Sequence, residues 1–352
     1  MNFNFRKKVA IDLGTTSILV YSRGGGVVLK EPSVVAIDRF KDKIVAVGEE
    51  AKQMLGRTPG NITALRPLKH GVIVDYESTE KMLKSFLAKA IGRTLIKPDI
   101  IICVPSGATQ VQKRAVIQAG TKAGGNRIYL IEEPLAAAIG AGIDIGDPGG
   151  NMVIDIGGGT TDIAVISIGN IVVSESIKIG GDTCDQAIID YIRRNFNVII
   201  GEKTAEEIKL SLASIDTKLD EKYYAKGRNI YNGLPVEIEL TVADIEKAIS
   251  GPINEIIETV HRVLSNTPPE LSADLFEKGV VLTGGGALLR GIADRIRNRI
   301  GIHVRIDENP ITSVVRGAGK SLNWISKIDS IEDNYFEQTR RQIANKERLR
   351  RR

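Results

Sequence analysis

The alternation of apolar and polar positions predicts the same element order at two places in the chain. VAIDLGTTSILVYS (residues 9–22) has an apolar run, a Gly/Thr turn and a second apolar run, which predicts strand, tight turn and strand. MVIDIGGGTTDIAVIS (152–167) repeats that pattern. Asp12 and Asp155 fall at the same point of it, where the first apolar run ends. The repeat indicates that the chain contains two related halves.

A second pair of matches follows in each half, in the same order. The apolar run of PDIIICVPSG (98–107) is similar to that of KGVVLTGGG (278–286), and both lead toward a helical pattern. IEEPLAAAIGAG (131–142) is matched by DENPITSVVRGAG (307–319). The segments that follow the first match, GGGVVLKEPSVV and GNIVVSESIKI, are also alike, so four matches in one order favour duplication over chance. Each half is therefore predicted to be an α/β unit, in which a hairpin-led sheet is followed by alternating strands and helices.

Two further stretches have no counterpart in the repeat. They lie near Val34–Pro67 and Cys184–Ala243, and we interpret both as inserted subdomains. Within the repeated parts, the spacing of apolar residues predicts helices over Gln110–Lys122 and Leu288–Arg299. The chain turns polar and charged from Trp324 onward, which indicates an exposed helix or a flexible tail.

Length and composition are those of a globular protein with two lobes. A chain of 352 residues exceeds the size at which one hydrophobic core stops growing, and 42% hydrophobic with 26% charged residues is ordinary. Cys103 and Cys184 lie in apolar sequence and are expected to be buried and reduced, as in a cytoplasmic protein. The three histidines are scattered, so a zinc site is not expected. No apolar run is long enough to span a bilayer or to act as a secretion signal.

The positive charge is concentrated at the C-terminus. Residues 340–352 contain seven Lys or Arg and one Glu, while the formal net charge of the whole chain is only +5. The body is therefore close to neutral. The tail could be a solvated charge run, a nucleic-acid arm or a contact for an anionic membrane. We rank nucleic acid lower and expect no nucleic-acid partner, because the tail has no aromatic residue after Phe336 and the body has no basic excess.

The Gly/Thr turns have the composition of phosphate-binding loops. Glycine lets the backbone approach an anion, and successive N–H groups form a concavity for it. One such turn would be an ordinary hairpin, but two facing copies favour a phosphate clamp. The residues concerned are Gly14, Thr15 and Thr16 in the first half and Gly157, Gly158, Gly159, Thr160 and Thr161 in the second.

Asp12 and Asp155 precede these turns and are candidate Mg²⁺ ligands. Mg²⁺ near phosphates retains most of its waters, so one or two carboxylates suffice, and we expect contact through water. The simpler explanation is that each side chain bonds to the backbone of its own turn. A metal–phosphate complex held between the halves requires the two carboxylates to converge.

The glycine triplet Gly284, Gly285 and Gly286 ends an apolar strand and opens a helix. Bare backbone there would admit a nucleotide base or ribose, and a tight strand–helix turn explains the glycines equally well. The chain has no GxxxxGK[ST] P-loop and no GxGxxG after its first strand. Neither a P-loop fold nor a dinucleotide-binding fold is therefore expected.

Glu133 breaks the symmetry of the repeat, because Asn309 occupies the matching position in the second half. A glutamate at a helix start is stabilised by the helix dipole by about 0.3–1 kcal/mol, which would be a purely structural reason for it. A carboxylate kept on one side of a symmetric cleft could also orient an attacking water for phosphate hydrolysis.

These motifs resemble the actin-like ATPase superfamily and, more narrowly, the MreB family of bacterial actins. The resemblance extends from Asp12 to about Asn323 and rests on IDLGTTSILVY, KEPSVVAID, RPLKHGVIVDY, IEEPLAAAIG, NMVIDIGGGTTDIAVIS, GEKTAEEIK, TPPEL and VLTGGGALLRGI. It implies an actin-like ATPase fold of two duplicated RNase H-like lobes, each with a small inserted subdomain, and ATP with Mg²⁺ in the cleft between them. The implied division is 1–34, 68–147 and 317–339 for subdomain IA, 35–67 for IB, 148–183 and 244–316 for IIA, 184–243 for IIB, and 340–352 for the basic tail.

The resemblance also assigns roles to individual residues. Glu133 and Thr160 are similar to the hydrolytic pair of the family, and Glu206 and Lys209 to its adenosine-side contacts. The chain departs from the family pattern at four positions, which are Ser17 in place of Asn, His70 in place of Asp, Asp162 in place of Glu, and Ala213 in place of Gly. Ser17 and Asp162 flank the phosphate loops and could alter hydrolysis or phosphate release.

The same resemblance implies partners. We expect head-to-tail polymerisation into protofilaments that pair and lie under the cytoplasmic membrane, where they organise cell shape together with the cell-shape machinery. Anionic lipids of the inner leaflet would be the membrane partner, at about 1 kcal/mol for each nearby cation and at most about 1.5–3 kcal/mol for each buried aliphatic side chain. The candidate contacts are the N-terminus with Phe3 and Phe5, the pair Leu95 and Ile96, and the tail with Arg348, Arg350, Arg351 and Arg352.

Other functions remain compatible with the sequence. A small-molecule kinase on the same fold would need an acceptor site with a base, and the sequence shows no such constellation. A filament scaffold that has lost hydrolysis would keep the phosphate loops, and comparing phosphate release from wild type and Glu133→Ala distinguishes it from an ATPase. A chaperone ATPase is disfavoured, because no substrate-binding domain follows Asn323.

Overall fold

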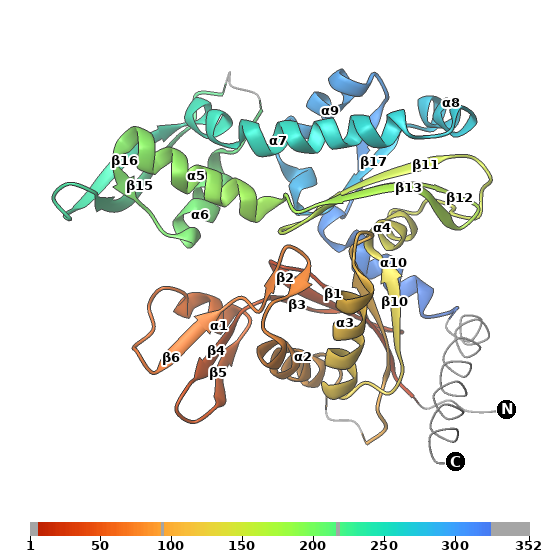
Figure 1. Ribbon diagram of the computed structural model, residues 1–352, viewed down its shortest axis with the longest axis horizontal. Helices are drawn as coiled ribbons and strands as arrows, with labels where there is room; N and C mark the ends of the chain where they lie inside the picture. Colours follow the sequence, from red (N-terminus) through yellow and green to blue (C-terminus); the bar gives the residue numbers. More distant parts are fainter. Residues whose placement is uncertain (1–5, 93–94, 216–218, 325–352) are drawn as a thin grey trace, which may run out of the picture.

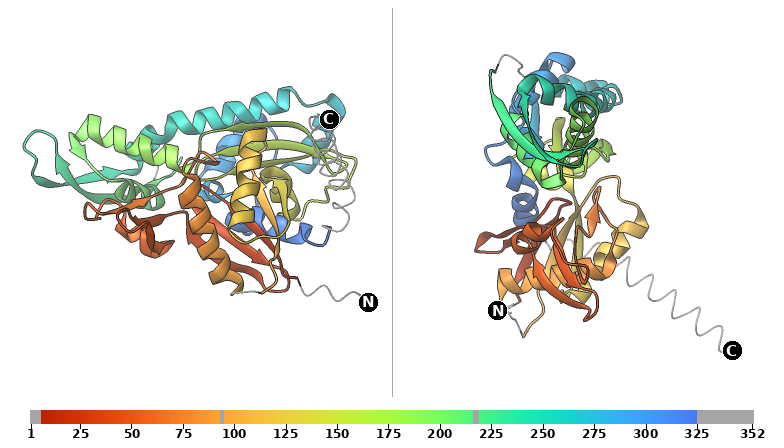
Figure 2. Two further views of the ribbon diagram at one scale, coloured as in Figure 1. Left: turned by 60° about the horizontal axis from the view of Figure 1, so that its bottom comes forward. Right: turned by 90° about the vertical axis from the view of Figure 1, so that its left-hand side faces the viewer.

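The chain forms two lobes that lie one above the other in Figure 1 and in the right-hand view of Figure 2. This computed structural model describes residues 6–92, 95–215 and 219–324. Each lobe is built on one five-stranded sheet, and each carries a smaller sheet toward the left of Figure 1. The two short helices α4 and α10 lie between the main sheets.

The first lobe is built around a sheet with the strand order β3-β2-β1-β9-β10. The first three strands of the chain pair antiparallel, whereas β9 runs parallel to β1 and to β10. Every residue of β9 is buried, as expected for a parallel strand covered on both faces. The strands are β1 (Lys8–Leu13), β2 (Ser17–Ser22), β3 (Gly26–Pro32), β9 (Asp99–Val104) and β10 (Ile128–Glu132).

The second lobe repeats this order as β13-β12-β11-β17-β18. Again the first three strands are antiparallel and the last two continue in parallel from the first. The predicted α/β class and the predicted duplication are therefore confirmed. The strands are β11 (Asn151–Ile156), β12 (Thr161–Ser167), β13 (Asn170–Ile177), β17 (Val280–Thr283) and β18 (Val304–Ile306).

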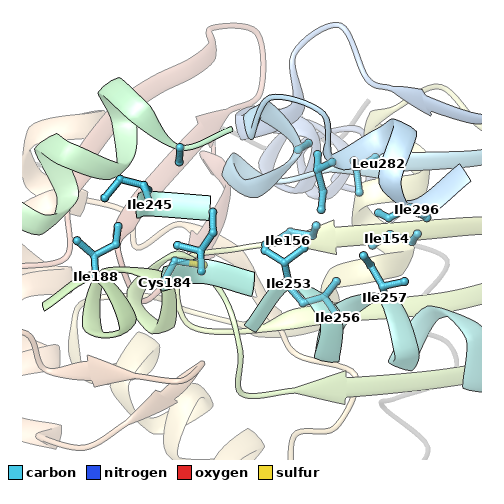
Figure 3. Packing of buried hydrophobic residues seen from close by; sticks show 14 of the residues in the cluster. Ile154, Ile156, Cys184, Ile188, Ile245, Ile253, Ile256, Ile257, Leu282 and Ile296 are labelled. Carbon is cyan, nitrogen blue, oxygen red and sulfur yellow. The ribbon is translucent and has the colours of Figure 1, made fainter. Parts of the chain in front are cut away.

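Outer helices bury an apolar stripe against each sheet. In the second lobe, α7 (Val242–Ser265) places isoleucines at helical spacing against β11. Figure 3 shows Ile253 and Ile256 of this helix beside Ile154 and Ile156 of the strand. The packing fixes the end of β11, where Asp155 lies. The other outer helices are α2 (Tyr76–Ile91), α3 (Gln110–Lys122), α8 (Pro269–Lys278) and α9 (Ile292–Ile300).

The two lobes are joined by close packing of α4 (Glu133–Gly140) against α10 (Ser313–Ser321). A methyl group on Gly140 would collide with the carbonyl oxygen of Ser313, and one on Gly317 with that of Ala136. These helices are the matched segments IEEPLAAAIGAG and DENPITSVVRGAG of the sequence repeat. Their small residues have a common physical reason, since only such residues let two helix backbones approach this closely.

The two insertions form the smaller sheets at the left of Figure 1. The first contains β4 (Val35–Asp38), β5 (Lys43–Val47), α1 (Glu49–Met54) and β6 (Ile62–Leu65). The second contains β14 (Val198–Ile199), α6 (Glu202–Leu212), β15 (Lys222–Asn229) and β16 (Pro235–Thr241), and α5 (Gly181–Phe196) leads into it. The remaining elements are β7 (Leu68–Lys69), β8 (Val72–Ile73) and the 3-10 turns η1 (Gly285–Leu288) and η2 (Pro310–Thr312).

One sequence prediction about helices was correct and another was partly wrong. The helix over Gln110–Lys122 is α3, with both bounds as predicted. The single helix over Leu288–Arg299 is instead the turn η1 followed by α9, because Gly291 adopts a φ of 84° and interrupts the helix. Three predicted subdomain boundaries fall inside helices: 183/184 in α5, 243/244 in α7 and 316/317 in α10. The subdomain division otherwise stays a prediction.

Two other expectations concern cysteines and membrane spans. Cys103 and Cys184 are free thiols and both are buried, as predicted. Within residues 6–92, 95–215 and 219–324, none of the helices combines the length and apolar character needed to cross a bilayer.

Candidate functional site

A cavity of about 890 Å³ lies between the two lobes. The turn after β1 and the turn after β11 both line it, so the duplicated halves present the same motif from opposite sides. Asp12, Glu133 and Asp155 also line the cavity. Its volume falls in the range of about 300–1,000 Å³ that is typical of small-molecule sites.

The two Gly/Thr turns lie face to face. A methyl group on Gly158 would collide with the hydroxyl of Thr16, and one on Gly159 with that of Thr15. The N–H of Gly157 donates to the carbonyl of Thr160 at 2.9 Å and closes the second turn. Glycine is needed here because any side chain would push the lobes apart at the loops.

Thr161 is the one residue of the predicted phosphate loops that does not line the cavity. Its side chain is fully buried, and its hydroxyl donates to the carbonyl oxygen of Ile179 at 2.7 Å. The structure therefore gives Thr161 a contact with its own lobe, whereas Gly14, Thr15, Thr16, Gly157, Gly158, Gly159 and Thr160 border the cavity.

Asp12 and Asp155 converge on the same cavity from the two lobes. Burial, and then repulsion from Asp155, raises the pKa of Asp12 from 3.8 to about 7. Burial likewise raises the pKa of Asp155 to about 7, although a hydrogen bond from Thr283 opposes the rise. The hydroxyl of Thr283 donates to Asp155 Oδ1 at 2.7 Å and orients that carboxylate. Two facing carboxylates of this kind favour a cation between them.

The donor set suits Mg²⁺ held together with phosphates. Among the described residues, no group of three or more His, Cys, Asp or Glu side chains is arranged to hold a metal ion. A dedicated protein cage is therefore absent from that part of the chain. Mg²⁺ commonly uses one or two carboxylates, several waters and substrate phosphates, which is what Asp12 and Asp155 beside two Gly/Thr turns would provide.

Glu133 lies where β10 ends and α4 begins, and only 9% of its surface is exposed. Burial, followed by repulsion from Asp162, Asp12 and Asp155, raises the pKa of Glu133 well above its ordinary value. Thr160 approaches the cavity from the second lobe and is 8% exposed. The predicted hydrolytic pair thus consists of one residue from each lobe on one cavity.

The glycine triplet after β17 lines the far part of the cavity. Gly284 has a φ of 80°, and its N–H donates to the carbonyl of Pro310 at 2.9 Å. Gly284 and Gly286 pack against the backbone and side chain of Ile156, whereas no atom lies within 4 Å of the Cβ position of Gly285. The triplet is therefore a tight turn that also leaves bare backbone facing open space.

Glu206 and Lys209 both lie on α6 and line the cavity. The ammonium of Lys209 donates to the carbonyl of Gly181 at 2.9 Å and to Asp185 Oδ2 at 2.8 Å. Glu206 pairs with Lys52 of the other lobe at 2.8 Å between Oε2 and Nζ. The predicted adenosine-side residues thus sit in an ionic network at the mouth of the cavity.

Sequence reasoning missed three members of this network, Lys52, Asp182 and Asp185. The hydroxyl of Thr16 donates to Asp182 Oδ1 at 3.1 Å, so the first phosphate loop is tied to the second lobe. The N–H of Asp182 donates to the carbonyl of Gly158 at 2.8 Å. The available signal was the Gly-Gly-Asp sequence of residues 180–182, which opens a helix directly after a strand.

The predicted membrane residues are placed only in part. Leu95 is fully exposed and Ile96 is 48% exposed, in the segment between α2 and β9. Arg348, Arg350, Arg351 and Arg352 lie outside the described residues, and so do Phe3 and Phe5. Leu95 and Ile96 do not line the cavity between the lobes.

The family model and the similar proteins all belong to one family. The family model described as "MreB/Mbl protein" matches residues 6–330. The chain is 48% identical over 327 residues to the cell shape-determining protein Mbl of Bacillus subtilis, covering 92% of this chain and 98% of that protein. It is 47% identical over 329 residues to the cell shape-determining protein MreB of Escherichia coli, covering 91% and 94% respectively.

Solved structures agree with this grouping. The crystal structure of MreB 5 of Spiroplasma citri bound to AMPPNP has a TM-score of 0.88 and 35% identity, and the match covers 94% of this chain and 99% of that one. A MamK double helical filament has a TM-score of 0.77 at 21% identity, covering 90% and 98%, which supports the fold. The expected actin-like ATPase fold is therefore confirmed, and this chain belongs to the MreB/Mbl family of bacterial actin homologues.

Proposed function

We propose that this protein binds and hydrolyses ATP with Mg²⁺ in the cleft, and polymerises into filaments that lie on the inner face of the cell membrane and organise cell shape. The observation that carries the proposal is the pair of Gly/Thr turns facing each other across a cavity with Asp12 and Asp155. MreB 5 of Spiroplasma citri, at 35% identity, binds AMPPNP and ADP in its crystal structures, which supports a nucleotide in this cavity.

Phosphate binding would use the backbone of both turns. N–H groups of the first turn and the hydroxyl of Thr15 would donate to phosphate oxygens from one lobe, and backbone N–H groups of residues 157–159 would donate to them from the other. Asp12 and Asp155 would hold Mg²⁺ through water, and the ion would neutralise charge on the phosphates. Because each lobe carries one Gly/Thr turn, a movement that brings the lobes together would also bring both turns onto the phosphates.

Hydrolysis would fall to Glu133 and Thr160. A buried carboxylate with a raised pKa is a stronger base than an exposed one, so Glu133 can accept a hydrogen bond from the attacking water and orient it. The hydroxyl of Thr160 reaches the same cavity from the opposite lobe and can hold that water from a second side. Since one group comes from each lobe, the water is held only when the lobes are close.

The adenosine would lie between α6 and the glycine triplet. The bare face of Gly285 leaves room for a ribose or base, and Glu206 and Lys209 offer an acceptor and a donor on the other side. Apolar side chains of α7 extend this part of the cavity, among them Ile249 and Ile253. A cavity with polar groups at one end and aliphatic groups at the other suits a nucleotide.

Filament formation and membrane contact rest on the family and on exposed apolar residues. Relatives of this chain are named cell shape-determining proteins, and MamK, which shares the fold, forms a double helical filament. The exposed pair Leu95 and Ile96 is a membrane contact of modest strength by itself. A filament repeats the contact at every subunit, so weak contacts add up to stable binding.

One experiment tests the enzymatic and the assembly parts together. Purified protein with Mg²⁺ and ATP is assayed for phosphate release and for pelleting at high speed, with AMPPNP and ADP as parallel conditions. We expect wild type to release phosphate and to pellet with ATP, and Glu133→Gln to pellet without releasing phosphate. Pelleting of wild type without phosphate release would instead identify a filament scaffold, and a protein that stays monomeric with ATP would contradict the proposal.

A further inference from the structure

Asp162 forms a buried connection between the two lobes. It lies on β12 of the second lobe and is 1% exposed. Its Oδ1 accepts two hydrogen bonds from Ser106 of the first lobe, from the backbone N–H at 2.8 Å and from the hydroxyl at 3.0 Å. Two hydrogen bonds to one buried carboxylate oxygen are stronger and more directional than a neutral pair.

Both ends of this connection lie next to the proposed hydrolytic pair. On the first lobe, Ser106 follows β9 by two residues, and the last residue of β9 pairs with Glu132, which precedes Glu133. On the second lobe, Asp162 lies on β12 and follows Thr160 by two residues, and Thr160 directly precedes that strand. The Ser106–Asp162 contact therefore joins the strand end beside Glu133 to the strand that begins beside Thr160.

The surroundings leave this connection little freedom. Asp162 lies directly opposite Asp155 in the β11–β12 ladder. Asp155 lines the cavity, so Asp162 is the cross-strand neighbour of a cavity residue. Gly107 packs against Ser176 of β13, where a Cβ atom would lie 3.1 Å from the Ser176 Cβ. Burial raises the pKa of Asp162, and the hydrogen bonds from Ser106 oppose the rise. The other oxygen, Oδ2, is buried and has no hydrogen-bond partner among the described residues. This carboxylate of the second lobe is thus hydrogen-bonded to the first lobe through Oδ1.

We propose that Asp162 is a positioning residue for hydrolysis, and that its contact with Ser106 sets the separation of Glu133 and Thr160 across the cleft. The inference rests on the proposed ATP hydrolysis. Asp162 itself does not line the cavity, so it acts through the residues it holds and not on the substrate. The length of its side chain is then a spacer, because one added methylene would move the two lobes by about 1 Å, a displacement that can cost about 100-fold in rate.

The test separates positioning from folding by measuring rate and affinity on the same variants. Single-turnover phosphate release at saturating Mg²⁺ and ATP reports hydrolysis, and the affinity for AMPPNP reports binding. We expect Asp162→Glu to slow release by about 10–100-fold and Ser106→Ala to slow it less, with AMPPNP affinity changed less than about three-fold in both. Combining Ser106→Ala with Asp162→Ala, which removes the acceptor, should be no slower than Asp162→Ala alone, since the two residues form one contact.

A matched control lies at the other end of the same strand. The hydroxyl of Ser167 donates to the carbonyl of Pro148 within the second lobe at 2.7 Å, far from the cleft. Ser167→Ala removes a buried hydroxyl from β12 and should leave both the release rate and the AMPPNP affinity at their wild-type values.

Each other outcome overturns the inference in a recognisable way. Wild-type release from Asp162→Glu, or an equal loss of rate and affinity, shows that Asp162 does not position the pair. If Asp162→Glu does not fold, Ser106→Ala carries the test alone, and an unchanged rate there has the same meaning. An active wild type with unaffected variants leaves the proposed ATPase function intact, whereas a wild type that releases no phosphate overturns that function and this inference together.

Discussion

Lys52 and Glu206 meet across the mouth of the cavity, with Nζ and Oε2 2.8 Å apart. Lys52 belongs to α1 in the first insertion and Glu206 to α6 in the second, so the contact joins the two small sheets. Both side chains are mostly buried, at 24% and 18% exposure. The α4–α10 crossing joins the lobes at the opposite end of the cleft. Residues of both contacts line the cavity, so a bound nucleotide would lie between them.

Breaking this ion pair should speed nucleotide release. A partly buried pair of this kind contributes about 1 kcal/mol, so Lys52→Met should raise the dissociation rate of a fluorescent ATP analogue by about five-fold in a stopped-flow chase. Lys81→Met is a suitable control, because Lys81 pairs with Asp42 and Glu77 within the first lobe. An unchanged dissociation rate in Lys52→Met would mean that the pair does not restrict the cavity.

The raised pKa of Asp155 predicts a pH-dependent stability with a definite sign. Its value of about 7 in the folded protein exceeds 3.8, so the folded state binds more protons between those values and the nucleotide-free protein becomes less stable as pH rises through that window. Asp155→Asn removes the ionisable group while keeping an acceptor for Thr283. Thermal unfolding should show the variant more stable than wild type above pH 7, by at most about 4 kcal/mol.

With Mg²⁺ and nucleotide bound, wild type should become more stable than Asp155→Asn above pH 7. They favour the ionised carboxylates, so the gain in melting temperature on adding Mg²⁺ with AMPPNP should be larger at pH 8 than at pH 6 for wild type. Asp155→Asn should show little of this gain at either pH. Equal gains for the two proteins at pH 8 would place the metal elsewhere.

The α4–α10 crossing should tolerate no added methyl group. Gly317→Ala would place a Cβ against the carbonyl of Ala136, and overpacking of this kind costs about 1–3 kcal/mol or more. Gly60 is a suitable control, because its φ is not positive and no atom beyond its chain neighbours lies within 4 Å of its Cβ position. Gly60→Ala should be neutral or stabilising by about 0.4–1 kcal/mol in denaturant titrations. Similar losses for both variants would refute the packing argument.

Membrane binding should depend on the exposed aliphatic pair. We expect Leu95→Ser with Ile96→Ser to reduce co-sedimentation of ATP-assembled protein with anionic liposomes, since each side chain contributes at most about 1.5–3 kcal/mol and every subunit carries both. Phe40→Ser removes another exposed apolar side chain, in the turn between β4 and β5, and serves as the control. Removing residues 340–352 tests the tail separately, and binding through the tail should fall as salt increases.

The sequence by itself determined the duplicated α/β architecture. The related turns, Asp-x-Gly-Thr-Thr at Asp12 and Asp-x-Gly-Gly-Gly-Thr-Thr at Asp155, were readable because each is local in sequence. The same holds for the matched segments that form α4 and α10. Periodicity also predicted α3 with both bounds. It did not predict the break before α9, because apolar spacing continues across Gly291 while the backbone there turns to positive φ. The hydrophobic pattern indicates which face of a segment is buried, but it does not indicate the backbone conformation between η1 and α9.

Only the tertiary structure decided which residues meet across the cleft. Lys52 with Glu206, Thr16 with Asp182 and Ser106 with Asp162 are separated by 56 residues or more along the chain. Nothing in local composition distinguishes such a lysine or serine from an ordinary surface residue. Their contacts follow from how closely two glycine-bearing helices cross, which sets the distance between the lobes. That distance depends on atoms far apart in the sequence, and therefore on the folded packing alone.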